Sequence, residues 1–278
     1  MLNEYTLTDG NFRTIAETLE DCAGIALPAS KRTLVYSRLV KRLRAVGVRS
    51  FTDYCDLITR DKDEQRRMIE ALTTNTTSFF REPHHFQHLT AELDTHLARS
   101  ANAGGALRLW SAACSSGEEP YSIALTVLQS IPNARNLDIK ILATDINSTV
   151  IERASKGQYS AESLETMPAA VRKKYFEPVA GSTELQVRPD ARDLIRFGVL
   201  NLQGPWPMKG RFDCIFCRNV MIYFSPETQE RLWLRFADQL KPDGTLYIGH
   251  SERVTGPAAQ VLTPAGPTTY VRTRGGVA

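Results

Sequence analysis

Apolar residues recur at helical spacing through the first hundred residues, and the pattern changes at Ala106. From there, apolar runs of strand length alternate with helical stretches, as in a parallel sheet covered by helices on both faces. We therefore predict a helical N-terminal domain over residues 1–72, a linker over 73–105 that ends in the small and polar residues 100–105, and an α/β domain over 106–278. The positions that carry the helical spacing are Phe12, Ile15, Leu19, Val35, Leu39, Leu43, Val46, Met68, Ile69 and Leu72.

Within the α/β domain the same patterns predict six strands and three intervening helices. A segment over about residues 157–192 is longer than a normal connection and contains the short alternating run Leu185, Val187. We interpret it as an inserted β-subdomain with a small antiparallel ribbon. The predicted strands are 106–112, 139–144, 194–200, 212–217, 245–249 and 269–272, and the predicted helices are 120–130, 148–156 and 226–240.

Composition narrows the classes of protein that this chain can belong to. The 278 residues are 42% hydrophobic, enough for a sizeable core, yet no apolar run reaches the roughly 18 residues of a membrane span. The first ten residues lack the profile of a signal peptide, and the five cysteines form an odd, scattered set. We expect a cytoplasmic protein with reduced thiols and no direct membrane insertion. A net charge of +3 does not by itself imply a nucleic-acid partner.

The first predicted strand leads into a junction with candidate ligand-binding residues. Residues 111–117 are small, which lets backbone approach a ligand closely, and Pro120 suits the first turn of the next helix. A phosphate would need the helix N-terminus free, but Glu118 and Glu119 are there. This argues against a pyrophosphate and for a positively charged ligand. The ammonium and sulfonium of S-adenosylmethionine meet that requirement.

Two later strand ends carry further polar residues. Asp145 is placed to bind ribose hydroxyls, although capping the helix that starts at Ser148 is an equally good interpretation. The absence of a Gly-x-Gly-x-x-Gly motif weighs against a nicotinamide cofactor. Arg218 and Asn219 follow the fourth strand, with Tyr223 a turn beyond, and could bind a ligand or fix the loop and pack in the core.

Residues 73–86, before the sheet, are rich in hydroxyl and amide side chains between aromatic residues. Such residues favour a turn, and Arg81 offers a forked donor for a carboxylate. A solvated linker between domains is the alternative interpretation.

Two groups of residues that resemble metal sites are better assigned to packing or to the surface. Cys214 and Cys217 belong to a predicted buried strand, and their spacing of three directs them to opposite faces. His84, His85 and His88 have no set of cysteines or carboxylates in the sequence to complete a site. We therefore predict no metal.

Taken together, six segments are similar to the chemotaxis receptor methyltransferases, the CheR family. The resemblance implies a Rossmann-like sheet with a helical N-terminal domain and a β-subdomain insert, and S-adenosylmethionine as the methyl donor, with S-adenosylhomocysteine as product. It further implies catalytic roles near the transferred methyl for Arg81 and Tyr223. The similar segments are NTTSFFRE (75–82), WSAACSSGEEPYSI (110–123), ATDI (143–146), VLNL (199–202), FDCIFCRNVMIYF (212–224) and GHSE (249–252). The residues that it implies contact the cofactor are Asn75, Thr77, Arg81, Glu118, Asp145, Asn201, Leu202, Arg218 and Asn219.

The activity implied by this resemblance is the esterification of glutamate side chains on bacterial chemoreceptors. A glutamate carboxylate is already ionised at neutral pH, so its attack on a sulfonium methyl needs no general base. The alternatives are a non-catalytic signalling module that binds S-adenosylmethionine, and a methyltransferase for another substrate. A nucleic-acid amine methyltransferase would be expected to carry an Asn-Pro-Pro-Tyr-type loop where this chain has Arg-Asn-Val-Met.

A basic segment over residues 31–49 is the candidate substrate surface. It has seven basic and no acidic residues, and Arg38, Lys41, Arg42 and Arg44 fall opposite an apolar helix face. Unmethylated receptor helices present clustered glutamates, and the resemblance implies that this helix recognises them, so we expect the cytoplasmic helices of chemoreceptors as partners. An ordinary solvated face is the alternative, and nucleic acid is not expected because aromatic residues are not interleaved. Residues 180–185 are fewer than in the glycine-containing loop of family members that grip a receptor tail, so tail-peptide binding is not expected.

Overall fold

A computed structural model describes residues 5–273 of the chain, and these residues divide into two compact units. The first unit contains residues 5–74 together with 201–205 and 223–228. The second contains 75–200, 206–222 and the rest of the described chain from 229 onward. We describe each unit by itself.

The helical unit is built from four α-helices, most of whose ends carry recognisable capping residues. Thr8 forms a capping box with Asn11, and Ser50 and Asp61 cap the third and fourth helices. Gly24 and Gly47 end the first two helices in the left-handed conformation. The helices are α1 (Asp9–Ala23), α2 (Arg32–Val46), α3 (Phe51–Arg60) and α4 (Lys62–Leu72), with a short 3-10 turn, η1 (Ala29–Lys31), before α2. Their inward faces bury Ile15, Leu19, Val35, Leu39, Leu43, Phe51, Tyr54, Ile58 and Met68.

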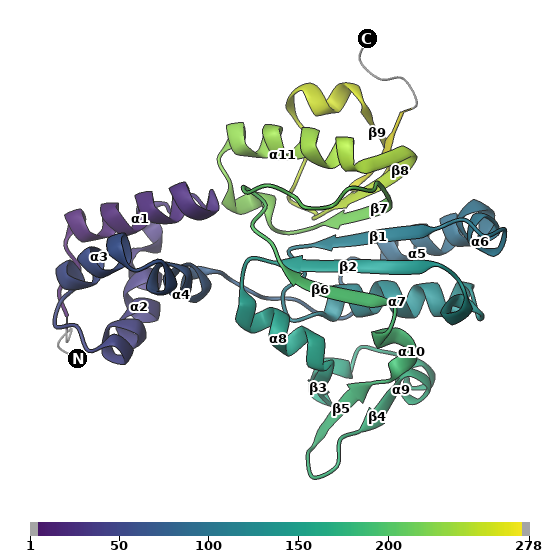
Figure 1. The fold of residues 1–278 in the computed structure, drawn as a ribbon, viewed down its shortest axis with the longest axis horizontal. Helices are drawn as coiled ribbons and strands as arrows, with labels where there is room; N and C mark the ends of the chain where they lie inside the picture. Colours follow the sequence, from purple (N-terminus) through teal and green to yellow (C-terminus); the bar gives the residue numbers. More distant parts are fainter. Residues whose placement is uncertain (1–4, 274–278) are drawn as a thin grey trace. The chain divides into compact units, whose positions relative to one another are not determined.

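A seven-stranded sheet in the order β6-β2-β1-β7-β8-β10-β9 forms the centre of the second unit (Figure 1). The strands from β6 to β8 are parallel, and β10 and β9 pair antiparallel at one edge. This confirms the predicted Rossmann-like α/β fold class. The strands are β1 (Leu107–Ala112), β2 (Ile139–Asp145), β6 (Ile195–Val199), β7 (Phe212–Cys217), β8 (Leu240–Ile248), β9 (Leu262–Gly266) and β10 (Thr269–Arg272).

Helices bury both faces of this sheet. On one face Phe216 of β7 stacks on Phe86 of α5, and on the other Trp110 of β1 packs against Phe236 of α11. Phe216 is in register with Ser111, the residue next to Trp110, so the two rings lie on opposite faces because side chains alternate along a strand. The helices are α5 (Pro83–Glu92), a π-helical turn η2 (Leu93–Leu97), α6 (Ala98–Asn102), α7 (Glu118–Ser130), α8 (Ser148–Lys156) and α11 (Pro226–Gln239), with 3-10 turns at η3 (Ala134–Asn136), η5 (Met221–Tyr223) and η6 (Gly256–Gln260).

The boundary between the two units falls between residues 74 and 75, whereas a linker over 73–105 was predicted. In the structure, residues 83–102 are helical and belong to the sheet unit. Phe86, Leu89, Leu93 and Leu97 are buried in the same core as α7. The segment is therefore part of the α/β unit's own packing.

The predicted insert is a small three-stranded antiparallel sheet in the order β3-β5-β4. Its turn between β4 and β5 is closed by a backbone hydrogen bond from Val179 to Glu184, and Gly181 adopts a left-handed φ of 74°. The insert consists of β3 (Gln158–Ser160), η4 (Glu162–Leu164), α9 (Ala169–Tyr175), β4 (Phe176–Pro178), β5 (Glu184–Val187) and α10 (Pro189–Arg192).

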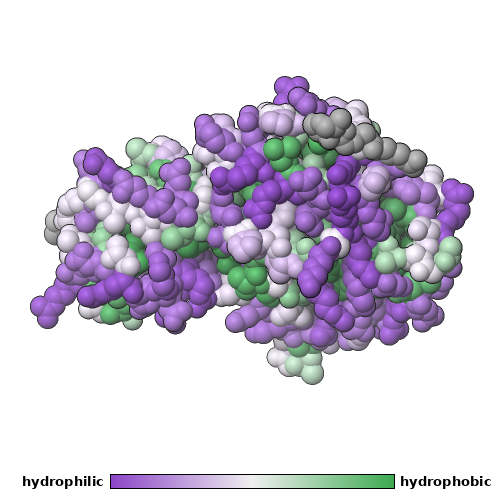
Figure 2. Space-filling model, turned by 45° about the horizontal axis from the view of Figure 1, so that its top comes forward, coloured by the Kyte–Doolittle hydropathy of each residue, from purple (hydrophilic) through white to green (hydrophobic). Residues whose placement is uncertain are grey.

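The surface face drawn in Figure 2 is mostly hydrophilic, with small separate apolar areas. Among the described residues, the exposed large apolar side chains are Val199, Ile222 and Leu234. No helix within residues 5–273 is both long and apolar enough to cross a membrane. All five cysteines lie in the described part of the chain and are free thiols there.

Candidate functional site

The loop that follows β1 holds an unusual backbone conformation. Ala113, Ser115 and Gly117 all have positive φ values, of 63°, 50° and 98°. A Cβ on Gly117 would lie 2.7 Å from the Tyr159 hydroxyl oxygen, so only glycine fits there. Non-glycine residues in this region cost free energy and occur at ligand-binding loops more than elsewhere. The three positive φ values make this loop a candidate ligand-binding loop.

Glu118 begins α7 at the end of this loop, and its side chain is buried. Ser116 Oγ donates a hydrogen bond of 2.7 Å to Glu118 Oε2. Burial nevertheless raises the pKa of Glu118 above its ordinary value. A cationic ligand beside this carboxylate would favour its ionised form again, so the site suits an ammonium group.

Asp145, at the end of β2, is held by backbone groups on both carboxylate oxygens. Ser115 N donates to Oδ2 and Asn147 N donates to Oδ1, each at 2.9 Å. The cap of α8 is Asn147, whose Oδ1 accepts from Thr149 N and Val150 N. Capping by Asp145 was one of the two interpretations from sequence, and the structure assigns that role to its neighbour. Burial raises the pKa of Asp145, and a carboxylate can accept about four hydrogen bonds, so capacity remains for ligand hydroxyls.

Arg218 lies at the end of β7, and its side chain is only 2% exposed. Its Nη1 is 3.0 Å from Glu119 Oε2, and its Nη2 is 3.2 Å from Glu82 Oε2. Ser111 Oγ donates to the other Glu119 oxygen at 2.6 Å. Burial raises the pKa of Glu119, which the positive charge of Arg218 opposes. Arg218 thus pairs with carboxylates from two other segments, and removing it would leave both without their cation.

Arg81 and Asn219, far apart in the sequence, are joined at the same place. Arg81 Nη2 donates to Asn219 Oδ1 at 3.0 Å, and Arg81 Nη1 donates to the Thr76 carbonyl oxygen at 3.1 Å. Arg218 Nη2 also donates to the Arg81 carbonyl oxygen. Asn219 adopts a left-handed φ of 58° and donates to Glu82 Oε1 at 3.3 Å. The structure thus brings three of the predicted residues into one network.

Asn75 and Thr77 lie in the segment that starts this unit. Ser115 Oγ, from the loop after β1, donates to the Asn75 carbonyl oxygen at 2.9 Å. Thr77 is half-buried two residues further along. Asn75 thus lies beside the loop that also contacts Asp145.

The remaining three predicted residues belong to the helical unit. Asn201 Nδ2 donates to the Cys22 carbonyl oxygen near the end of α1 at 2.6 Å, and Leu202 is buried. The Tyr223 carbonyl oxygen accepts from Ala26 N at 2.8 Å. Within the helical unit, Asn201 therefore contacts the end of α1, and Tyr223 contacts the segment that follows α1.

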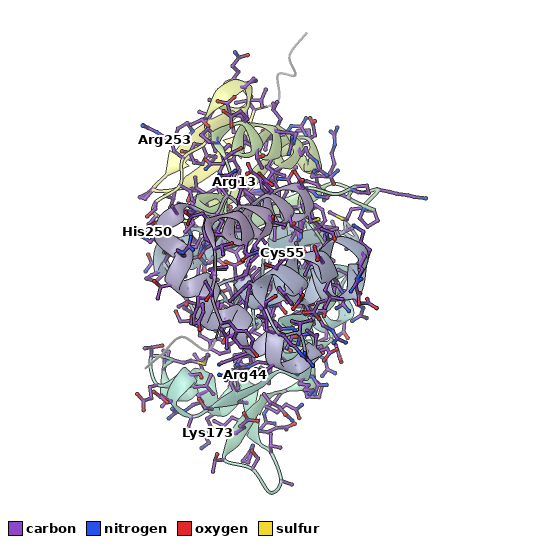
Figure 3. All side chains as sticks on the ribbon, turned by 90° about the vertical axis from the view of Figure 1, so that its left-hand side faces the viewer. Arg13, Arg44, Cys55, Lys173, His250 and Arg253 are labelled. Atoms are coloured by element: carbon purple, nitrogen blue, oxygen red, sulfur yellow. The ribbon has the colours of Figure 1, made fainter. Side chains whose placement is uncertain are left out.

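The four cations predicted on one face of α2 differ in their surroundings. Arg42 makes a double hydrogen bond with the buried carboxylate of Glu64, at 3.0 Å and 2.5 Å. Arg38 donates to the Leu72 and Thr73 carbonyl oxygens at 2.8 Å each, at the end of α4. These two arginines hold the helical unit together. Lys41 and Arg44 are exposed, and Figure 3 labels Arg44 on the helical unit.

One expectation about the histidines was wrong. Glu82 lies beside His84 and His85, with possible ligand atoms within 4.8 Å of one another, so a carboxylate does accompany them. However, Arg218 Nη2 lies 3.2 Å from Glu82 Oε2 and already supplies the positive charge. His85 Nε2 is 2.8 Å from Thr268 Oγ1, and burial lowers the His85 pKa to about 3. The cluster is best described as a polar part of the core.

Two carboxylates in this site, Glu82 and Glu252, received no role from the sequence, and Glu119 received only that of attracting a cationic ligand together with Glu118. Glu82 follows Arg81 directly, Glu119 follows Glu118, and Glu252 ends the GHSE segment. The only indication in the sequence that these carboxylates belong to the site was that all three lie inside the six segments similar to the CheR family. The sequence does not say that two of them pair with Arg218, because that requires the order of strands in space.

A Rossmann-like sheet with buried carboxylates beyond β1 and at the end of β2, and no glycine-rich dinucleotide motif, has the features expected of a methyltransferase of the S-adenosylmethionine-binding class. Residues 75–271 match the CheR methyltransferase, SAM binding domain, and residues 10–73 match the CheR methyltransferase, all-alpha domain. The chain belongs to the CheR methyltransferase family. This confirms the predicted resemblance and the predicted cofactor, S-adenosylmethionine.

The curated relatives are similar over nearly their whole length. A probable chemotaxis protein methyltransferase of Rhizobium etli is 48% identical over 259 residues, covering 92% of this chain and 97% of the relative. Chemotaxis protein methyltransferase 2 of Pseudomonas aeruginosa is 42% identical, with coverage of 96% and 94%. The chemotaxis protein methyltransferase of Escherichia coli is 40% identical, with coverage of 97% and 93%. The chain is thus a bacterial-type chemotaxis methyltransferase.

Proposed function

We propose that this enzyme transfers the methyl group of S-adenosylmethionine to glutamate side-chain carboxylates of chemoreceptors, forming methyl esters. The observation that carries the proposal is the Arg81 guanidinium, which Asn219 holds in the turn just after β7. A planar, permanently charged fork suits an incoming carboxylate better than an amine or a base edge would. Membership of a chemotaxis methyltransferase family supports the same substrate class.

The residues that would hold the cofactor divide by chemistry. The buried Glu118 carboxylate suits the ammonium, and Asp145 suits the two ribose hydroxyls. Asn75, Thr77, Asn201, Leu202, Arg218 and Asn219 complete the proposed set. When bound, S-adenosylmethionine supplies a methyl on a positively charged sulfur. That methyl needs no further activation by the protein.

The task of the protein is alignment and exclusion of water. A glutamate carboxylate is ionised at neutral pH, so a base is not required. Arg81 orients the carboxylate so that one oxygen lies in line with the methyl carbon, and Tyr223 keeps the catalytic role that the family resemblance implies for it. Arg81 already donates to Asn219 and to the Thr76 carbonyl oxygen, which limits how tightly it can pair with the substrate. A looser pair leaves the attacking oxygen more nucleophilic.

Recognition of the receptor helix is proposed for the exposed cations of α2. Lys41 and Arg44 are exposed, whereas Arg38 and Arg42 are engaged with α4. Because Lys41 and Arg44 are the exposed members of the four, we assign contact with receptor glutamates chiefly to them, and assign positioning of the helix to the other two. The proteins that would be bound are the cytoplasmic helices of chemoreceptors.

The test is transfer of labelled methyl from S-adenosylmethionine to purified chemoreceptor cytoplasmic fragments, followed by mild base. Label released as methanol supports a carboxyl ester, and base-stable label would refute the glutamate substrate. Arg81→Ala should lose most of the turnover at saturating concentrations of both substrates. Arg99→Ala, which removes an exposed arginine from α6, serves as the matched control and should keep it.

A further inference from the structure

Glu252 lies after β8, in the turn that follows Gly249, and its carboxylate is surrounded by backbone N–H groups. Oε2 accepts from Asn219 N at 3.0 Å and from Gly249 N at 2.6 Å. Oε1 accepts from Val220 N and Met221 N at 2.8 Å each. Four backbone donors from two loops therefore converge on one side chain.

Three of these donors are consecutive residues of the loop that carries the site. The successive N–H groups of Asn219, Val220 and Met221 form a concave anion-binding group, and the anion is part of the same chain. Asn219 holds a left-handed φ of 58°, a conformation that costs a non-glycine residue free energy and persists only where surrounding contacts enforce it. Glu252 supplies those contacts.

The turn is also confined from the side of β8. A Cβ added to Gly249 would lie 2.6 Å from Asn219 N and 2.9 Å from its Oδ1. The same Oδ1 accepts the hydrogen bond from Arg81, and the preceding residue is Arg218. Any shift of the turn would therefore move the Asn219 side chain away from the Arg81 guanidinium.

We propose that Glu252 is a positioning residue for the cofactor site, whose carboxylate holds the Arg218–Asn219 turn in its binding conformation. Four backbone N–H groups bind this carboxylate, and two of them belong to Asn219 and its neighbour Val220. The carboxylate acts through the turn and needs no contact with the cofactor. The inference rests on the proposed cofactor roles of Arg218 and Asn219, and it does not depend on the glutamate substrate.

The decisive variant is Glu252→Gln, which keeps the shape of the side chain. Whichever way the amide lies, its NH₂ faces two backbone N–H donors, so two hydrogen bonds are lost and two donors are opposed. We expect the Kd for S-adenosylmethionine, measured by calorimetry on the full chain, to rise by about tenfold or more. The KM for the cofactor should rise in parallel, with a smaller change in kcat at saturation.

Arg253→Gln is the matched control, because Arg253 is the neighbour of Glu252 in the sequence and takes no part in the turn contacts described above (Figure 3). It should bind the cofactor as the unmodified protein does. Amide hydrogen exchange supplies a local readout: in Glu252→Gln the amides of residues 219–221 should exchange faster, while those of β1 and β2 keep their protection. A uniform gain in exchange across the sheet, or a Kd within about twofold of the unmodified value, would overturn the proposal.

A second variant covers the case in which Glu252→Gln does not fold. Gly249→Ala pushes on the same turn from β8 and leaves the carboxylate in place. This variant should raise the Kd for the cofactor and speed hydrogen exchange at the amides of residues 219–221. A folded Gly249→Ala protein with normal cofactor binding would contradict the claim that the conformation of this turn determines cofactor affinity. Since both readouts use the cofactor alone, an error in the receptor substrate would appear only in the methanol assay and would leave these results unaffected.

Discussion

The buried ion-pair group around Arg218 yields a stability prediction that can be worked from its geometry. In Arg218→Met the side-chain volume is roughly kept, while Glu119 and Glu82, each only 11% exposed and 3.0 and 3.2 Å from the lost guanidinium, remain without their cation. Leaving one member of a buried pair uncompensated typically costs about 3–5 kcal/mol. For a chain of this size, each kcal/mol corresponds to roughly 2–4 °C, so the Tm should fall by about 6–20 °C.

Removing the second charge should restore part of that loss. In Arg218→Met, Glu119→Gln one of the two carboxylates that lose Arg218 is neutral and only Glu82 remains charged, so the free energy of unfolding should recover by at least about 1–2 kcal/mol relative to the single variant. The penalty in Arg218→Met should also shrink as the pH falls toward 5. Without Arg218 the folded-state pKa of Glu119 lies further above its unfolded value, so protonation relieves the folded state first.

Urea unfolding followed by tryptophan fluorescence measures this unit specifically. All three tryptophans, Trp110, Trp206 and Trp233, belong to the sheet unit. Arg211→Met, at an exposed arginine just before β7, is the control and should change stability by less than about 0.5 kcal/mol. If Arg218→Met stays within about 1 kcal/mol of the unmodified protein, or the double variant recovers nothing, the ion-pair reasoning is refuted.

Three further predictions concern the binding loop and its surroundings. Gly117→Ala places a Cβ 2.7 Å from the Tyr159 hydroxyl at a φ of 98°, so calorimetry should show cofactor affinity lowered by about tenfold, and unchanged affinity would contradict the assigned loop conformation. Cys114 is buried and burial raises its pKa well above the ordinary value, so a thiol reagent at about pH 8 should modify it only after unfolding; rapid labelling of the native protein would contradict this. Burial pushes the pKa of Glu82 up, but Arg218 and hydrogen bonds outweigh it and lower that pKa from 4.5 to about 2. Because its folded-state pKa lies below the unfolded value, the stability lost in Glu82→Gln should be largest above about pH 5 and should shrink as the pH falls toward about 3; a constant difference in unfolding experiments would contradict this.

The sequence predicted the central strands well because short, continuous apolar runs between turn residues are typical of strands buried on both faces. The bounds of β7 and β10 match the predicted ranges, and β1, β2 and β6 differ by a residue or two. β9 was missed because only Leu262 of its five residues is buried and Pro264 interrupts it. β8 begins earlier than predicted, at Leu240, because Leu240 pairs with Phe212 before a register shift, and residues 241–244 separate it from the continuous pairing that resumes at Thr245.

The helical spacing of Phe86, Leu89, Leu93 and Leu97 was visible in principle, yet the segment was assigned to a linker. An apolar stripe shows that a helix buries one face, but it does not show which core receives that face. Here the stripe packs in the core of the sheet unit, on the side where Phe216 stacks on Phe86. Only the folded chain reveals that α5 belongs to the methyltransferase domain.

For the carboxylates of the site, too, the sequence does not show which groups each side chain contacts. Glu118 and Glu119 are adjacent, and sequence alone gave both the role of attracting a cation. In the structure, Glu119 already pairs with Arg218 and accepts from Ser111, so its charge is used within the protein. Glu118 accepts its hydrogen bond from Ser116, a neutral hydroxyl, and its pKa stays raised. A buried carboxylate that is not bonded to a cation of the protein is the one suited to a cationic ligand, and this criterion requires coordinates.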